Sequence, residues 1–385
     1  MRRRTKAGVA AALTLAVALA AVAAGNDYLR AAAFVIQAAG MQGVARSVAQ
    51  VEINAIDERD LAVPWRGGML RARLYRPQAA SDRAMLLVPG VHASGVDEPR
   101  LVQFARDLAS VRHTVLTVEP TDLTRYRITP RSTDMIEDAA FWLSQQSTLA
   151  PDGRVGMMGI SFAGGLSIVA AARPSIRDRI AFVLSFGGHG DLPRTLAYLC
   201  SGVQPDGTHR PPHDYGLAIV LLGVAGDVVP AEQVQPLADA ILSFLEASRL
   251  DMIDKAASAR EFARARGLET ALPEPARTYM GHVNARDVAR LGPILLPHTL
   301  KGSGDPALSP TRTPAPAAPV YLLHGNDDNV IPAIESSLLA GTLRAKGVAV
   351  QQLATPLITH AKVTSAPAAA DLWRLVRFWR RVLDE

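Results

Sequence analysis

The sequence predicts an α/β protein with a mostly parallel central sheet that helices flank, and three observations predict it. Short apolar runs alternate with stretches of helical spacing, which is typical of buried parallel strands joined by helices. One apolar run stops at a serine between small residues, where a strand passes directly into a helix. The alternation is suspended over residues 191–319, where helical segments and proline-rich connectors predict an inserted helical cap.

Composition limits the class of protein. The chain has 385 residues, 49% apolar and 20% charged, which indicates a globular protein with one large domain and an insertion, or two domains. The net charge is +5, but four of these charges come from Arg2, Arg3, Arg4 and Lys6. The rest of the chain has a net charge of 5 − 4 = +1. No other basic patch with interleaved aromatic residues occurs, so we expect no nucleic-acid partner. The single cysteine, Cys200, excludes an internal disulfide and a multi-cysteine zinc site, and we expect a buried, inert thiol.

The N-terminus has the order of a secretory signal. Four positive charges within residues 1–6 precede the uncharged, alanine-rich run 7–26, and Ala21-Val22-Ala23 offers a small-x-small cleavage site. Twenty residues can also span a bilayer, so an uncleaved anchor is the alternative. The mild hydrophobicity of alanine favours cleavage of a signal peptide at residues 1–26. Either way we expect the rest of the chain outside the cytoplasm, exported to the periplasm or beyond, or anchored at the inner membrane.

The first half of the chain is expected to form an extension and the first part of the core. Residues 27–58 form a helical N-terminal extension that either packs on the core or lies along the membrane. Val51–Pro77 alternates as a half-buried strand pair, with Gly67-Gly68 at its turn. Residues 59–190 are the first part of the core, with strands predicted at 84–89, 114–118, 154–159 and 180–186, and helices at 98–110, 132–146 (capped by Ser132) and 162–172.

The second half is expected to form the cap and the rest of the core. Within the cap, 191–319, helices are predicted at 235–249, with Pro236 in the first turn, and at 252–266. A proline-rich stretch then returns to the core as an extended linker. Residues 320–385 complete the core, with strands predicted at 320–324 and 348–353, and helices at 332–346 and 367–383.

The serine turn reads Gly159-Ile160-Ser161-Phe162-Ala163, with Ser161 at its apex. Such a turn presses together the side chains two positions before and after the serine, so Gly159 and Ala163 must be small. The turn resembles the nucleophile turn of the alpha/beta-hydrolase superfamily, in the G-x-S-x-A form of dienelactone hydrolase-like members. The resemblance implies a strained serine whose hydroxyl stands clear of the sheet.

A serine hydroxyl needs a base, which an acid orients, and the resemblance implies the chain order serine, acid, histidine. Residues 320–332 resemble the acid-bearing turn of the superfamily, His-Gly-x-x-Asp-x-x-apolar-Pro. This match assigns the acid to Asp328, with Asp327 as the fallback and His324 as a scaffold residue. A carboxylate that only stabilises its own turn is the structural alternative.

The base implied by this order is His360, 32 residues after Asp328 and the last histidine of the chain. Thr359 precedes it, where many members of the superfamily have glycine. Asp191, just after a predicted strand, is a weaker alternative for the acid. A glycine hinge into the cap is the simpler interpretation of Gly187–Asp191.

The remaining requirement is an oxyanion hole. The backbone N–H of Phe162 begins the nucleophile helix, where the helix dipole favours negative charge. Pro89–Gly95 resembles the His-Gly-x-x-Gly loop of the superfamily, with Pro89 in place of the histidine. The second donor is then the N–H of Val91, with His92 as an alternative.

The resemblance covers residues 63–189 and 320–385 and implies a serine hydrolase with an acyl-enzyme intermediate and no cofactor. A small-molecule carboxylic ester is the favoured substrate. The rivals are a serine peptidase of the prolyl oligopeptidase-like type, whose large N-terminal propeller the sequence lacks, and a non-catalytic hydrolase-fold binding protein. Pro211-Pro212 and the lack of a fourth ligand argue against a metal site at His209, His213 and Asp214.

Overall fold

The computed structural model describes residues 25–39, 53–79, 81, 83–251, 253–358 and 369–385. Within them a single sheet has the strand order β1-β2-β4-β3-β5-β6-β7-β8. β1 and β2 form an antiparallel hairpin, β2 also pairs antiparallel with β4, and the other pairs are parallel. The prediction of a mostly parallel sheet is therefore confirmed. The strands are β1 Ile56–Trp65, β2 Gly68–Pro77, β3 Ala84–Val88, β4 Thr114–Val118, β5 Val155–Ile160, β6 Ile180–Phe186, β7 Val320–Gly325 and β8 Val350–Thr355.

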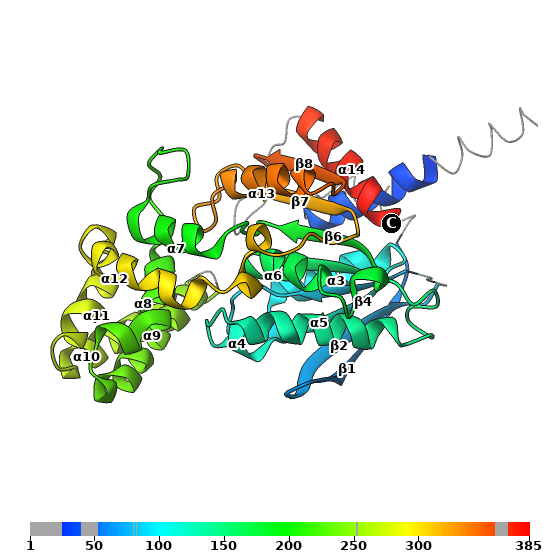
Figure 1. Cartoon of the computed structure of the whole chain (residues 1–385). Helices are drawn as coiled ribbons and strands as arrows, with labels where there is room; N and C mark the ends of the chain where they lie inside the picture. The colour runs from blue at the N-terminus through cyan, green and yellow to red at the C-terminus, as the bar shows by residue number, and fades with distance from the viewer. Residues whose placement is uncertain (1–24, 40–52, 80, 82, 252, 359–368) are drawn as a thin grey trace, which may run out of the picture.

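Helices cover both faces of the sheet (Figure 1). Successive side chains of a strand point to opposite faces, so Leu86 of β3 joins one apolar core and Leu87 joins the other. Because both faces are covered, β3 is apolar along its whole length. The first core includes side chains of α5 Pro130–Ser144, α6 Phe162–Ala171 and α13 Ile334–Ala345, and the second includes those of α3 Pro99–Ser110 and α14 Ala369–Leu383.

Residues 25–38 form a helix that packs on the second core. The ring of Phe34 lies 4.5 Å from that of Trp379 on α14, centroid to centroid, and Tyr28 stacks on Trp373 at 5.2 Å. The described part of the predicted extension therefore packs on the core, and β1 begins at Ile56. No helix among the described residues is long and apolar enough to cross a membrane. The segment that predicts a signal or anchor lies mostly outside the described residues.

The cap is a group of helices at one end of the sheet (Figure 1, left). α9 begins four residues earlier than predicted, so Pro236 lies inside the helix and not in its first turn. The return to the core is not an extended linker either, because η4 Pro306–Leu308 and η5 Pro310–Arg312 are short 3-10 helices. The cap helices are α7 Leu192–Ser201, α8 Asp214–Val228, α9 Ala231–Leu250, α10 Lys255–Ala271, α11 Ala276–Ala285 and α12 Val288–Ser303.

The start of helix α5 differs from the prediction. Helix α5 begins at Pro130 with Thr129 as the N-cap residue, so the prediction that Ser132 caps this helix is wrong. Proline suits the first helical position because its missing N–H would have no intrahelical acceptor there.

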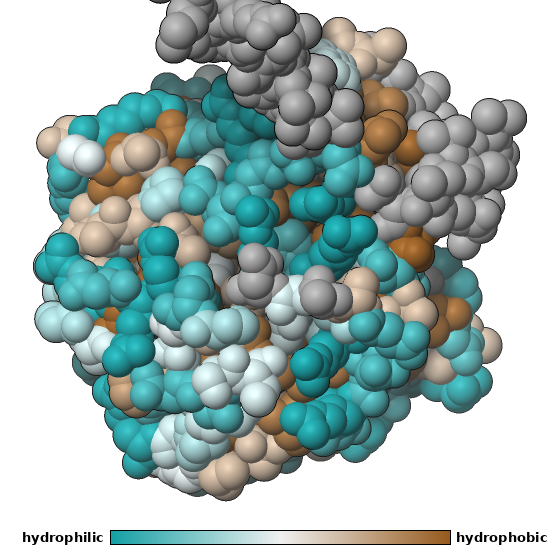
Figure 2. All heavy atoms as spheres, turned by 90° about the vertical axis from the view of Figure 1, so that its right-hand side faces the viewer, coloured by the Kyte–Doolittle hydropathy of each residue, from teal (hydrophilic) through white to brown (hydrophobic). Residues whose placement is uncertain are grey.

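The face turned away from the cap is mostly hydrophilic, and its apolar residues lie in small separate patches (Figure 2).

Candidate active site

Ser161 sits at a strained turn between β5 and α6. Its backbone has φ 55° and ψ −134°, a conformation that L-residues rarely adopt and that persists where the surroundings impose it. The Ser161 N–H donates to the Phe186 carbonyl at 2.7 Å, which attaches the turn to the end of β6. The residue is only 9% exposed.

The packing around this turn explains why its residues are small. A Cβ atom at Gly159 would lie 2.2 Å from the carbonyl oxygen of Ala163 and 2.6 Å from Oγ of Ser167. The first of these atoms belongs to the backbone and cannot rotate away. The spacing in the sequence predicted this restriction, and the structure gives its physical cause.

We expect Gly159→Ala to lower the free energy of unfolding by about 2–3 kcal/mol, because the added methyl group overpacks the turn. The control is Gly341→Ala on α13, an exposed position where nothing lies within 4 Å of the added Cβ. Removing backbone freedom inside a helix should make this control about 0.5–1 kcal/mol more stable. Urea unfolding of both variants checks the prediction, and equal stabilities would contradict the close packing at Gly159.

The loop after β3 lies directly against the nucleophile turn. A Cβ at Gly90 would be 3.1 Å from Cβ of Ser161 and 3.8 Å from its Oγ. Phe162 is the first residue of α6, so its N–H has no intrahelical acceptor. Among the residues that the structure describes, the Val91 N–H donates no hydrogen bond. Two backbone donors thus come from the two segments that meet at Ser161.

The His92 side chain takes part in the structure of its own loop. Its Nδ1 accepts a hydrogen bond from the Ser94 N–H at 3.2 Å, and its carbonyl accepts one from the Gly95 N–H at 3.1 Å. Burial lowers the pKa of this imidazole, which favours the neutral ring. These contacts give His92 a structural part in the loop. With Nδ1 as the acceptor, the proton of the neutral ring lies on Nε2, so the ring stays an alternative donor.

Asp328 is a buried carboxylate, 3% exposed, in the turn after β7. Its Oδ1 accepts the N–H groups of Val330 at 2.8 Å and Ile331 at 3.0 Å. Its Oδ2 faces the end of β6, 3.5 Å from where a Cβ of Gly187 would be. Gly187 directly follows Phe186, whose carbonyl binds the Ser161 N–H, so the carboxylate lies at the strand end beside the nucleophile turn.

Asp327 and His324, the other two candidates of this turn, have different surroundings. The side chain of Asp327 is 72% exposed and faces Arg210 at 3.5 Å. His324 is fully buried, with Nδ1 2.6 Å from Oγ of Ser336 and Nε2 2.7 Å from the Ile331 carbonyl. Its ring thus joins the end of β7 to the acid turn and to α13, as a scaffold residue would.

His360 lies outside the described residues, so its position stays a prediction. The last described residues before it begin beside the acid turn. There the Asn326 N–H donates to the carbonyl of Thr355, at the end of β8, at 3.0 Å. Leu357, buried and two residues further on, donates its N–H to Oγ1 of Thr355 at 3.2 Å.

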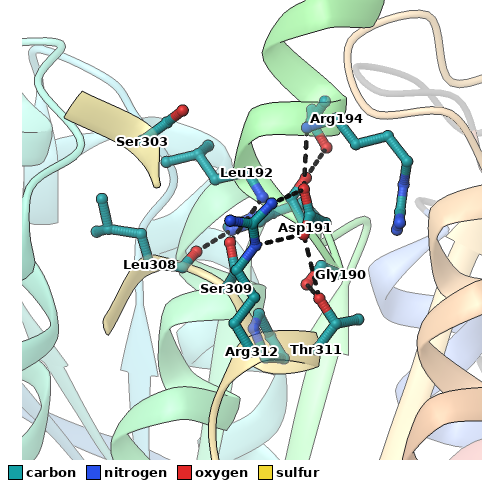
Figure 3. Close-up of polar contacts among 12 residues, drawn as sticks. Gly190, Asp191, Leu192, Arg194, Ser303, Leu308, Ser309, Thr311 and Arg312 are labelled. Atoms are coloured by element: carbon teal, nitrogen blue, oxygen red, sulfur yellow. Dashed lines mark hydrogen bonds and ion pairs between the residues drawn. The ribbon is translucent and has the colours of Figure 1, made fainter. Parts of the chain in front are cut away.

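Asp191 has a structural task at the base of the cap (Figure 3). Its Oδ1 caps α7 by accepting the Arg194 N–H at 3.0 Å, and its Oδ2 accepts from Nε of Arg312 at 2.7 Å. Burial alone would raise the pKa of this carboxyl, but Arg312 and the Arg194 N–H outweigh it and lower the pKa. These contacts join the two chain connections of the cap and give Asp191 a structural part there.

The other polar candidates have local partners. Nδ1 of His213 lies 2.9 Å from Asp214, which also pairs with Arg286 at 2.7 Å. No group of three side chains that could hold a metal ion occurs in the described part of the chain. Cys200 is buried, and burial raises the pKa of its thiol to about 12.

Comparisons with known proteins identify the class of fold. No protein-family model and no curated protein sequence matches the chain. An acylaminoacyl peptidase solved with Z-Gly-Gly-Phe-chloromethyl ketone matches with a TM-score of 0.50 and 14% identity, over 89% of this chain and 44% of the peptidase. An esterase from Pyrobaculum calidifontis matches with a TM-score of 0.45 and 16% identity, over 92% of this chain and 88% of the esterase.

A putative dienelactone hydrolase from Klebsiella pneumoniae matches with a TM-score of 0.43 and 14% identity, over 85% of this chain and 99% of that protein. The chain spans less than half the length of the peptidase. The fold is that of the alpha/beta-hydrolase superfamily, as the sequence resemblance implied.

Proposed function

We propose that this protein is a serine hydrolase that cleaves small-molecule carboxylic esters through an acyl-enzyme intermediate. The single observation that supports it most is the strained Ser161 turn, which lies between the Gly90–Val91 loop and the strand end that Asp328 faces. Residues with rarely populated backbone angles cluster at active sites and ligand-binding sites. The predicted signal or anchor at residues 1–26 adds the proposal that the protein works outside the cytoplasm.

In the proposed reaction, Oγ of Ser161 attacks the ester carbonyl while His360 accepts its proton. Asp328 holds the imidazole in the tautomer that can accept this proton and stabilises the resulting cation. The N–H groups of Val91 and Phe162 stabilise the negative charge on the former carbonyl oxygen, each worth about 3 kcal/mol. The intermediate expels the alcohol, which takes the proton from His360, and water then cleaves the acyl-enzyme by the same steps.

The test is labelling with a fluorophosphonate probe, followed by mass spectrometry of the labelled peptide. We expect the label on Ser161, together with hydrolysis of p-nitrophenyl acyl esters and no measurable cleavage of the matching anilides. Measurable cleavage of the anilides would favour the peptidase, since peptidases cleave activated esters too. A folded protein that neither takes the label nor cleaves either substrate would favour the binding protein.

A further inference from the structure

The first cap helix, α7, packs on the segment that holds Asp328. Arg194 and Tyr198 lie one turn apart and therefore on the same face of this helix. The Arg194 guanidinium donates to Glu335 on α13 at 2.5 and 2.9 Å, and the Tyr198 hydroxyl donates to the Asn329 carbonyl at 3.2 Å. Glu335 is only 1% exposed and also accepts the Gly190 N–H, so this face of α7 is held firmly.

The connection between α7 and α8 contacts the same turn. Arg210 donates from Nη1 to the Asn326 carbonyl at 3.3 Å, and its Nη2 lies 3.5 Å from Asp327. The His213 N–H donates to the Asn329 carbonyl at 2.8 Å. Residues on both sides of Asp328 are therefore hydrogen-bonded to the cap, and Asn329 accepts two of these bonds.

Of the two residues that donate to the Asn329 carbonyl, Tyr198 is the more buried. The residue is 1% exposed, and burial raises the pKa of its hydroxyl to about 12, so the group stays a donor throughout the neutral range. Removing the hydroxyl leaves the Asn329 carbonyl with the His213 N–H alone, so this oxygen is held by one donor instead of two. The Asn329 carbonyl and the Val330 N–H belong to one planar peptide unit, so movement of this carbonyl also moves the N–H that holds the Asp328 carboxylate.

We infer that Tyr198 is a positioning residue, whose hydroxyl acts together with the His213 N–H to fix the Asn329 carbonyl and through it the direction of the Asp328 carboxylate. This inference rests on the proposed function. The cap then does more than cover the site, because it supplies a contact on which the geometry of the acid depends. A cap that lacked the Tyr198 hydroxyl would leave Asp328 in place, but its carboxylate would be less well aligned.

The test compares Tyr198→Phe with Tyr321→Phe. Tyr321 is a matched control, since it is also a buried tyrosine, lies on β7 itself, and donates its hydroxyl to Glu385 near the C-terminus, away from the acid turn. We expect Tyr198→Phe to lower kcat about tenfold with KM unchanged, because small errors in catalytic geometry cost rate rather than ground-state binding. The control should keep the kcat of the wild type.

The pH profile separates alignment from simple structural damage. A poorly aligned carboxylate stabilises the imidazolium less, so the acid limb of kcat/KM should move to lower pH in Tyr198→Phe. A profile that keeps its wild-type position would overturn the inference.

A second readout is the rate of fluorophosphonate labelling in an Asp328→Asn background. There Tyr198→Phe should change the rate less than twofold, because the acid through which it acts is already gone. A full tenfold effect in that background would also overturn the inference. Failure of the proposed function is distinct, because the wild-type protein itself would then take no label.

Discussion

Ser161→Ala should abolish fluorophosphonate labelling and reduce the hydrolysis of acyl esters by at least about 10⁴-fold. The variant removes the attacking oxygen but keeps the Cβ atom, so the turn at φ 55° bears the same strain as before. The expected loss is therefore chemical and not a loss of fold. Circular dichroism and urea unfolding should match the wild type while kcat falls.

The matched control is Ser167→Ala, on the same helix as the nucleophile turn. Its hydroxyl is buried and has no hydrogen-bond partner among the described residues, so removing it should cost no activity. If Ser161→Ala kept its label and its activity, the nucleophile would have to be another residue.

The strands of the core could be predicted because their cause is local. The strands at 114–118 and 180–186 have the predicted bounds, since a buried parallel strand is a short apolar run that ends where polar residues or glycine begin.

The helices of the cap were harder to predict. Helix α8 is apolar almost all round, because the five consecutive residues from Leu217 to Leu221 are all buried. It therefore has no amphipathic period to detect. Pro293 and Pro297 concealed α12, in which both lie.

In the candidate site, too, local features could be predicted and long-range contacts could not. Ser161, Asp328 and the two backbone donors stand in local motifs at strand ends, so the resemblance of these motifs to known ones could predict them as candidates. The contacts of Tyr198 and Arg194 join residues more than 100 positions apart in the chain, and no local pattern marks such pairs. They depend on where the cap packs, which only the folded chain decides.

Asp328→Asn should reduce kcat about 10³–10⁴-fold, because an amide cannot both hold the base in its active tautomer and stabilise its cation. The amide oxygen can still accept from the N–H groups of Val330 and Ile331, so the turn should keep its shape. The other atom becomes an NH₂ group, which donates where the carboxylate accepts. Steady-state hydrolysis of a short acyl ester measures the loss.

Asp327→Asn is the control, because it makes the same chemical change at the adjacent residue. Its side chain is 72% exposed and its contact with Arg210 is at the surface, where an ion pair is worth little. We expect less than a twofold change in kcat. A large loss in Asp327→Asn with a small one in Asp328→Asn would transfer the role of acid to Asp327. The buried carboxylate would then only stabilise its turn, because its two backbone hydrogen bonds suffice for that task alone.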